Sequence, residues 1–108
     1  HIEIKTSPTH HTINVDSPLD SIYYTEDFRV KILDENLNSR GNTQNWTTLE
    51  SKLDKMYLNY EFVISDDTHN KKIFSCSETN GKIYSQRIIS IGSGSDFEFR
   101  KIKLGVCY

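Results

Sequence analysis

The sequence predicts an all-β fold: an antiparallel β-sandwich of about seven strands, with one short helix near residues 48–55. Two observations carry this prediction. The chain of 108 residues contains no alanine, the residue that favours helices most strongly. Isoleucine, threonine, tyrosine and phenylalanine are plentiful and fall mostly in short runs that alternate with polar residues. Such runs are typical of strands with one buried face.

Seven segments show the alternation that indicates strands. They cover residues 2–5, 12–15, 28–33, 57–64, 72–77, 83–91 and 97–106. The fourth segment has the clearest pattern, because Tyr60, Phe62 and Ile64 share one face. Between the fifth and sixth segments, Asn80-Gly81 favours a two-residue hairpin turn, so we expect those two strands to pair.

In the last of these segments, the apolar residues switch from odd-numbered to even-numbered positions. Phe99 and Ile102 would point to opposite faces of a regular strand. This indicates either a bulge near Arg100-Lys101 or a strand that is buried on both faces. The basic stretch Arg100-Lys101-x-Lys103 alternates with Ile102 and Leu104, so we expect it on the solvent face of this terminal strand.

The remaining segments predict turns, a loop and the helix. Asp16–Asp20 contains Pro18 and is expected to be a turn. Asp34–Thr43 is rich in Asn, Asp, Ser and Gly, which indicates a long loop. Thr47 and Glu50 match a capping box with Thr47 at the N-cap, and apolar residues follow at helical spacing. The alternative to a helix here is a loop anchored by isolated leucines.

Composition places bounds on the function. The formal net charge is −2, so the chain shows no electrostatic signature of nucleic-acid binding. No apolar run reaches the ~18 residues that a membrane-spanning helix needs. The length suits one domain with a single core. Because the chain begins with His1 rather than Met, we expect residues 1–108 to be a processed product or one domain of a larger surface or secreted protein.

Cys76 and Cys107 are the only cysteines. Two cysteines in a small secreted β-domain most often form one disulfide; the alternative is a pair of buried thiols in a reducing compartment. Asn45-Trp46-Thr47 is the one N-glycosylation sequon. A disulfide and a glycan on Asn45 would both place the protein outside the cell or on its surface.

No motif indicates catalysis, a metal or a cofactor. His10 and His11 are adjacent, so on a strand their side chains point to opposite faces and cannot easily share one metal ion, although a loop would allow it. Zinc-binding spacings and a Gly-x-Ser-x-Gly elbow are absent. Serines flank Cys76, and neither of them lowers the pKa of a thiol. We therefore expect a protein that is not an enzyme and that needs no cofactor.

Acidic residues gather in the expected loops. They are Asp16, Asp20, Asp34, Glu35, Asp66, Asp67 and Asp96. Loops at one end of a sandwich can collect carboxylates around calcium, so a calcium-binding C2-like module is one alternative. The other is that aspartate occurs here because it forms turns.

Aromatic residues divide between core and surface. We assign to the core Phe28, Tyr60, Phe62 and Phe74. Trp46, Tyr23 and Tyr57 are the candidate binding-surface residues. Exposed Trp and Tyr provide large contact areas at a low entropic cost.

Residues 24–38, YTEDFRVKILDENLN, resemble the second strand of immunoglobulin-like and filamin-like surface repeats. The resemblance implies the broad sandwich class. It does not extend to antibody-type domains, because Trp46 precedes both cysteines and the tyrosine before the second cysteine is missing. Residues 97–104 resemble the last strand of carbohydrate-binding jelly rolls.

These observations predict a non-catalytic extracellular module for protein–protein recognition, adhesion or structural spacing. Its partner would be a protein on a cell surface or in the extracellular space, and not nucleic acid. Loops 34–47, 66–71 and 92–96 are the expected contact regions. The alternatives are a carbohydrate-binding jelly roll that uses Trp46 and Tyr57, a secreted enzyme inhibitor that presents the loop 92–96, and the C2-like module.

Overall fold

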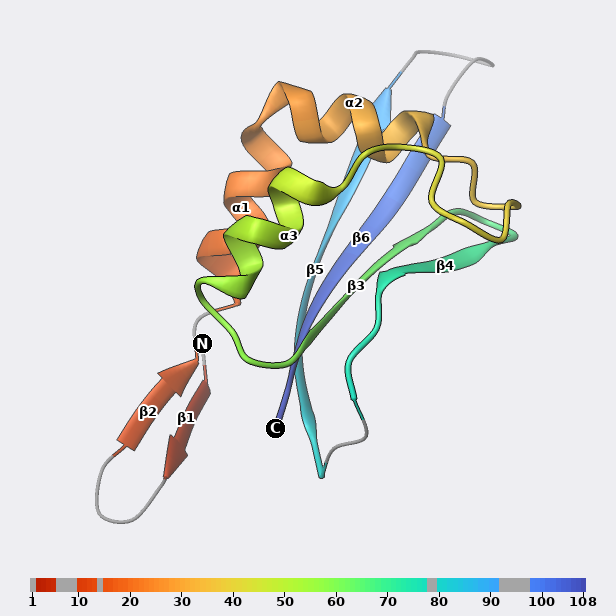
Figure 1. Cartoon of the computed structure of the whole chain (residues 1–108). Helices are drawn as coiled ribbons and strands as arrows, with labels where there is room; N and C mark the ends of the chain where they lie inside the picture. Colours follow the sequence, from red (N-terminus) through yellow and green to blue (C-terminus); the bar gives the residue numbers. More distant parts are fainter. Residues whose placement is uncertain (1, 6–9, 14, 78–79, 92–97) are drawn as a thin grey trace.

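In place of the expected sandwich, the chain adopts an α+β fold in which helices cover one face of an antiparallel sheet (Figure 1). This computed structural model describes residues 2–5, 10–13, 15–77, 80–91 and 98–108. The elements are β1 (Ile2–Lys5), β2 (His10–Ile13), α1 (Asp16–Tyr24), α2 (Glu26–Asp34), α3 (Thr47–Asp54), β3 (Tyr60–Ser65), β4 (Asn70–Phe74), β5 (Lys82–Ile91) and β6 (Glu98–Cys107). β1 and β2 form a sheet of their own, and the other strands form one sheet in the order β4-β3-β6-β5. The prediction of an all-β sandwich was therefore wrong.

The expected turn at Asp16–Asp20 is instead the start of α1. Pro18 is the third residue of this helix. The first N–H groups of a helix have no intrahelical acceptor, so proline loses no hydrogen bond there. Leu19 and Ile22, three residues apart, are both fully buried. This short apolar stripe gives α1 the face that it packs against the sheet.

The segment 28–33, expected to be a strand, lies in α2. Its residues alternate, but the helix buries Phe28 and Ile32, which are four residues apart, and leaves Val30 49% exposed. The residues that are buried thus follow the four-residue spacing of a helix and not the two-residue alternation of a strand. Residues 24–38 comprise the last residue of α1, the whole of α2 and the start of the following loop, so their resemblance to an immunoglobulin-like strand does not reflect the fold.

The helix expected near residues 48–55 is present as α3. Its start differs from the expected capping box. The N-cap residue is Trp46, which makes no side-chain capping bond. Asn45 Oδ1 instead accepts a hydrogen bond from the Thr47 N–H at 3.0 Å, so the asparagine satisfies one of the free donors at the helix start.

Asn80-Gly81 does not form the expected hairpin, because β4 and β5 lie at opposite edges of the sheet (Figure 1). Gly81 exchanges two backbone hydrogen bonds with Tyr108, at 3.0 and 2.9 Å. β5 pairs with β6, and β6 pairs with β3. The last strand of the chain is therefore central in the sheet.

The irregular pairing lies elsewhere than expected. β5 and β6 pair over ten residues in one continuous register, so there is no bulge near Arg100-Lys101. The register shifts instead between β3 and β4, at Phe62 and Val63. Ile73 and Phe74 are adjacent in β4, yet both contact the core. A bulge allows this by turning two successive side chains to the same side.

The hydrophobic core lies between the helices and one face of the large sheet (Figure 1). The helices contribute Leu19, Ile22, Phe28, Ile32, Leu49 and Leu53. The strands contribute Tyr60, Phe62, Ile64, Ile83, Ile89, Ile102, Leu104 and Val106. Because side chains alternate along a strand, the residues between these form a second face.

Candidate binding face on the sheet

The face of the large sheet that points away from the helices carries a distinctive set of side chains. Strand register and alternation with the core place on it Glu61, Val63, Lys72, Lys82, Tyr84, Gln86, Ile88, Lys101, Lys103 and Gly105. We call this set the open sheet face. Tyr84 and Ile88 are its large apolar residues with substantial exposure, 44% and 56%. Cationic and aromatic groups thus share one side of the molecule.

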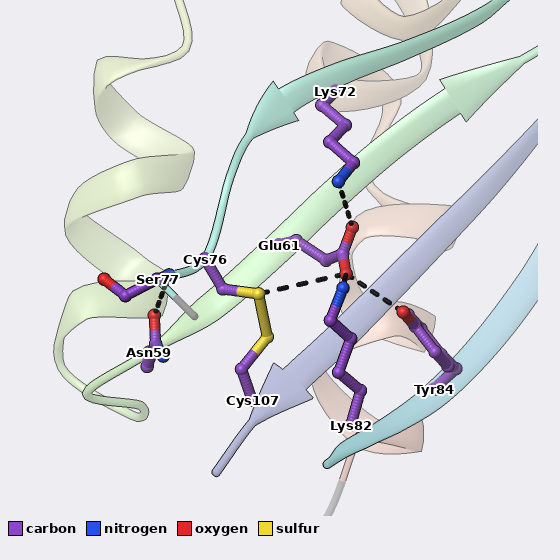
Figure 2. The surroundings of a disulfide bond; sticks show 8 residues. All are labelled: Asn59, Glu61, Lys72, Cys76, Ser77, Lys82, Tyr84 and Cys107. Carbon is purple, nitrogen blue, oxygen red and sulfur yellow. Dashed lines mark hydrogen bonds and ion pairs between the residues drawn. A yellow bond between two sulfur atoms is a disulfide. The ribbon is translucent and has the colours of Figure 1, made fainter. Parts of the chain in front are cut away.

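Glu61 lies at the centre of the open sheet face and is only 2% exposed. Lys82 Nζ is 2.9 Å from Glu61 Oε1, and the Tyr84 hydroxyl donates to the same oxygen at 3.0 Å. Lys72 Nζ is 3.7 Å from Glu61 Oε2. Figure 2 shows these side chains converging on Glu61 from β4 on one side and β5 on the other. The carboxylate therefore links three strands of the sheet.

The charges around Glu61 set its protonation state. Burial on its own would raise the pKa of the Glu61 carboxyl, but the hydrogen bonds from Lys82 and Tyr84 outweigh burial and lower that pKa. The hydrogen bond to Glu61 raises the pKa of Lys82. Burial and the same carboxylate raise the pKa of Tyr84. At neutral pH, Glu61 and Lys82 are therefore charged and form an ion pair, and the Tyr84 phenol beside them is neutral.

Gly105 allows Tyr84 to reach Glu61. The Tyr84 side chain starts on β5 and crosses β6 at Gly105, which is its register partner. A Cβ atom at residue 105 would lie 2.5 Å from Tyr84 Cε1. Lys103 Nζ sits 4.5 Å from the centroid of the same ring, within the range of a cation–π contact. Any side chain at position 105 would push the tyrosine off the sheet.

A disulfide joins Cys76 to Cys107 next to Glu61 (Figure 2). It ties the segment after β4 to the end of β6, with the two Cα atoms 6.4 Å apart. Cys76 Sγ lies 3.9 Å from Glu61 Oε1. The two sulfurs and the carboxylate are close enough to hold a metal ion. Because the sulfurs are bonded to each other, the group offers no thiolate ligand in this state.

Charge is segregated between the two sides of the molecule. The open sheet face carries four lysines and one glutamate. The three helices together carry seven acidic and three basic residues. The formal net charge of −2 therefore averages over a cationic sheet face and an anionic helix layer. Opposite charges gathered on separate faces steer charged partners to one side.

None of the three predicted surface aromatics lies on the open sheet face. Trp46 is 4% exposed and packs beside Phe62 in the core, so its assignment to the surface was wrong. The indole can be buried because its Nε1–H group donates a hydrogen bond to the carboxylate of Glu35, which is also buried, at 2.7 Å. Tyr23 and Tyr57 are partly buried against the same core.

The loop residues follow a different pattern from the one expected. The acidic side chains bind protein groups: Glu35 binds Lys71, Asp66 accepts from the backbone N–H of His69, and Asp20 binds Arg87. Without a sandwich, and with these carboxylates engaged, the C2-like alternative loses its structural basis. The loop 92–96, which the inhibitor alternative uses, and Asp96 lie outside the described residues. Asn45 of the sequon is exposed.

Sequence reasoning identified part of the open sheet face. It placed the stretch Arg100-Lys101-x-Lys103 on the solvent side of a strand. The structure confirms that side for the two lysines, but Arg100 has the opposite parity and is only 18% exposed. Sequence reasoning missed Glu61, Lys82 and Tyr84, because no local pattern shows which strands become neighbours. The one available signal was an ionisable residue, Glu61, inside the most apolar strand.

No family model, curated protein or solved structure matches this chain. In the part of the chain that the structure describes, no helix is long and apolar enough to cross a membrane.

Proposed function

We propose that this protein is a non-catalytic extracellular recognition module whose contact surface is the open sheet face. One observation carries the proposal: the helices cover only one side of the sheet, and the other side presents lysines, Tyr84 and Ile88 on a rigid, disulfide-linked scaffold. Binding residues that rigid strands hold are positioned more precisely than those on loops. This replaces the loops as the expected contact region.

The disulfide supports the extracellular assignment. Disulfides persist in oxidising compartments and are rare in the cytosol. Exposure of Asn45 is compatible with glycosylation of the sequon. The intact mass of protein secreted from eukaryotic cells, before and after reduction and alkylation, tests both points. Two alkylated cysteines before reduction would contradict the assignment.

The chemistry of the described side chains supports a non-catalytic role. The polar groups at the centre of the open sheet face form ion pairs and hydrogen bonds with one another, as Glu61 does with Lys82. Thr68 Oγ1 contacts His69 Nδ1 at 2.8 Å, but both residues are exposed in a turn that Asp66 stabilises through backbone hydrogen bonds. A nucleophile needs a base that a third group orients in a site shielded from water, and Thr68 and His69 are both exposed to solvent.

A binding screen tests the proposed surface. The protein would be joined artificially into tetramers and tested for binding to arrayed extracellular proteins and glycans. Two variants would be tested in the same way: Lys101→Glu on the open sheet face and Lys55→Glu on the helix side. Both variants change the charge equally. We expect a partner that binds the wild type and Lys55→Glu but not Lys101→Glu. A partner that is lost only with Lys55→Glu would move the contact surface to the helices and overturn the proposal.

A further inference from the structure

We infer that the open sheet face binds an acidic glycan, a polysaccharide that carries sulfate or carboxylate groups; this inference rests on the proposed function. The observations that carry it are the arrangement of the lysines, the absence of arginine among the described residues of that face, and the position of Tyr84.

The lysines form a grid whose spacing the sheet sets. Lys101 and Lys103 are two residues apart on β6, a distance of about 7 Å along the strand. Lys72 on β4 pairs with Val63, which in turn pairs with Lys103. Lys72 and Lys103 are therefore two strands apart, about 10 Å. Regularly spaced cations suit a chain that repeats its negative charges.

Two of the lysines are left to bind an external anion. Glu61 is within ion-pair distance of Lys72 and Lys82. Within the described ranges, no carboxylate pairs with Lys101 or Lys103. Lys103 lies against the Tyr84 ring, and Lys101 is exposed. An anionic ligand would supply the counter-charge that the described carboxylates do not.

Lysine rather than arginine favours a glycan over a protein. Centres of protein–protein interfaces are enriched in arginine and depleted in lysine. The lysine ammonium is a compact, strongly hydrated point charge that needs no fixed fork geometry. It therefore suits sulfate or carboxylate groups on a flexible, hydrated polymer.

Tyr84 adds a contact that charge alone does not provide. Its side chain lies across the sheet rather than upright, held by Gly105 below and by its hydrogen bond to Glu61. The residue is 44% exposed, and its ring adjoins Lys103. An exposed aromatic surface beside a cation can contact the apolar C–H groups of a sugar while the cation binds its acidic substituent.

The test uses heparin as the acidic glycan, dextran as the uncharged glycan and double-stranded DNA as a polyanion without sugar acids. The wild type is compared with Lys101→Gln/Lys103→Gln and with the matched control Lys31→Gln/Lys55→Gln, which removes two charges from the helix side. All three proteins are first compared by thermal melting. We expect heparin binding that weakens with salt, a loss of about two- to thirtyfold in the open-face variant, and no loss in the control.

Several outcomes would overturn the inference. Equal losses in both variants would mean non-specific attraction. DNA binding as tight as heparin binding, through the same lysines, would show a general polyanion surface. If heparin does not bind, but an arrayed protein binds the wild type and Lys101→Glu abolishes that binding, the glycan is rejected and the proposed function stands. No array partner and no heparin binding would reject both.

Discussion

Lys71 and Glu35 form a buried ion pair that attaches the loop after α2 to the edge strand β4, with Lys71 Nζ 2.7 Å from Glu35 Oε2. The same ammonium donates to the carbonyl of Asn36 at 2.9 Å and to that of Gly41 at 2.7 Å. Glu35 also accepts from the Trp46 indole. The pair therefore organises a loop that has few apolar anchors of its own.

Lys71→Met should destabilise the protein strongly, because it leaves the Glu35 charge buried without its partner. We expect a loss of about 3–5 kcal/mol in the free energy of unfolding. Chemical denaturation followed by the fluorescence of Trp46, the only tryptophan, measures it. The neighbouring Lys72→Met is the control and should cost no more than about 1 kcal/mol, because Lys72 is 53% exposed. Equal losses would contradict the role assigned to the pair.

Glu35 also predicts a pH dependence of stability. Burial raises its pKa, but the hydrogen bonds from Lys71, Thr43, Trp46 and Gln44 outweigh burial and lower the pKa from 4.5 to about 2. A carboxyl whose pKa is lower in the folded state stabilises the protein at any pH above its pKa in the unfolded chain. This stability is lost as the pH falls from 4.5 towards 2.

The measurement for this prediction is the free energy of unfolding from pH 7 to pH 2 in the wild type and in Glu35→Gln. The wild type should lose more stability on acidification than the variant. Other carboxyls with lowered pKa values, Glu61 and Asp66 among them, remain in both proteins and cancel in the difference. Parallel curves would rule out Glu35 as the source.

Reduction of the disulfide should lower stability because it frees a loop in the unfolded chain. Cys76 and Cys107 are 31 residues apart in sequence, so the chain-entropy model predicts about 3–4 kcal/mol. Urea unfolding with and without reductant measures the loss, and Cys76→Ser/Cys107→Ser should reproduce it. If reductant destabilised this double variant equally, the effect would not come from the disulfide.

Gly105→Ala should destabilise the fold by about 1–3 kcal/mol, because the new methyl group overlaps Tyr84 and displaces it from Glu61. In a Tyr84→Ala background the same substitution should cost much less, because the ring is gone. A double-mutant cycle on the free energies of unfolding measures the coupling. Additive effects would show that Gly105 is required for another reason.

Arg87→Ala should promote self-association through the edge of β5. Gly81 and Tyr108 form a doubly hydrogen-bonded pair, so by alternation the Gln86 backbone groups point away from β6. Arg87 Nη1 binds the Gln86 carbonyl at 2.8 Å, and its Nε binds Asp20 at 2.9 Å. The arginine thus blocks an edge that could pair with another chain.

Sedimentation velocity over a range of protein concentrations tests this prediction. The sedimentation coefficient of Arg87→Ala should rise with concentration more steeply than that of the wild type. Arg40→Ala removes the same charge from an exposed loop residue and should behave as the wild type does. Matching behaviour in both variants would attribute any association to charge rather than to the edge.

Local patterns predicted some elements and not others. The apolar spacing after Asn45 predicted α3, and the alternation of Tyr60, Phe62 and Ile64 predicted β3 with the face that it buries. The same reasoning failed in α2, because a run of six alternating residues also contains the four-residue spacing of Phe28 and Ile32. Packing against the sheet, not the local pattern, decides between the two.

The order of the residues is enough to show the local features: the segments that carry apolar stripes, the lysines that alternate with them, and the single pair of cysteines available for a disulfide. Which strands become neighbours, and with them the fold class and the open sheet face, depends on long-range packing. Glu61 is buried because β4 and β5 bring Lys72, Lys82 and Tyr84 around it. Such contacts join residues far apart in the chain, so they depend on the pairing of whole strands and leave no local signature.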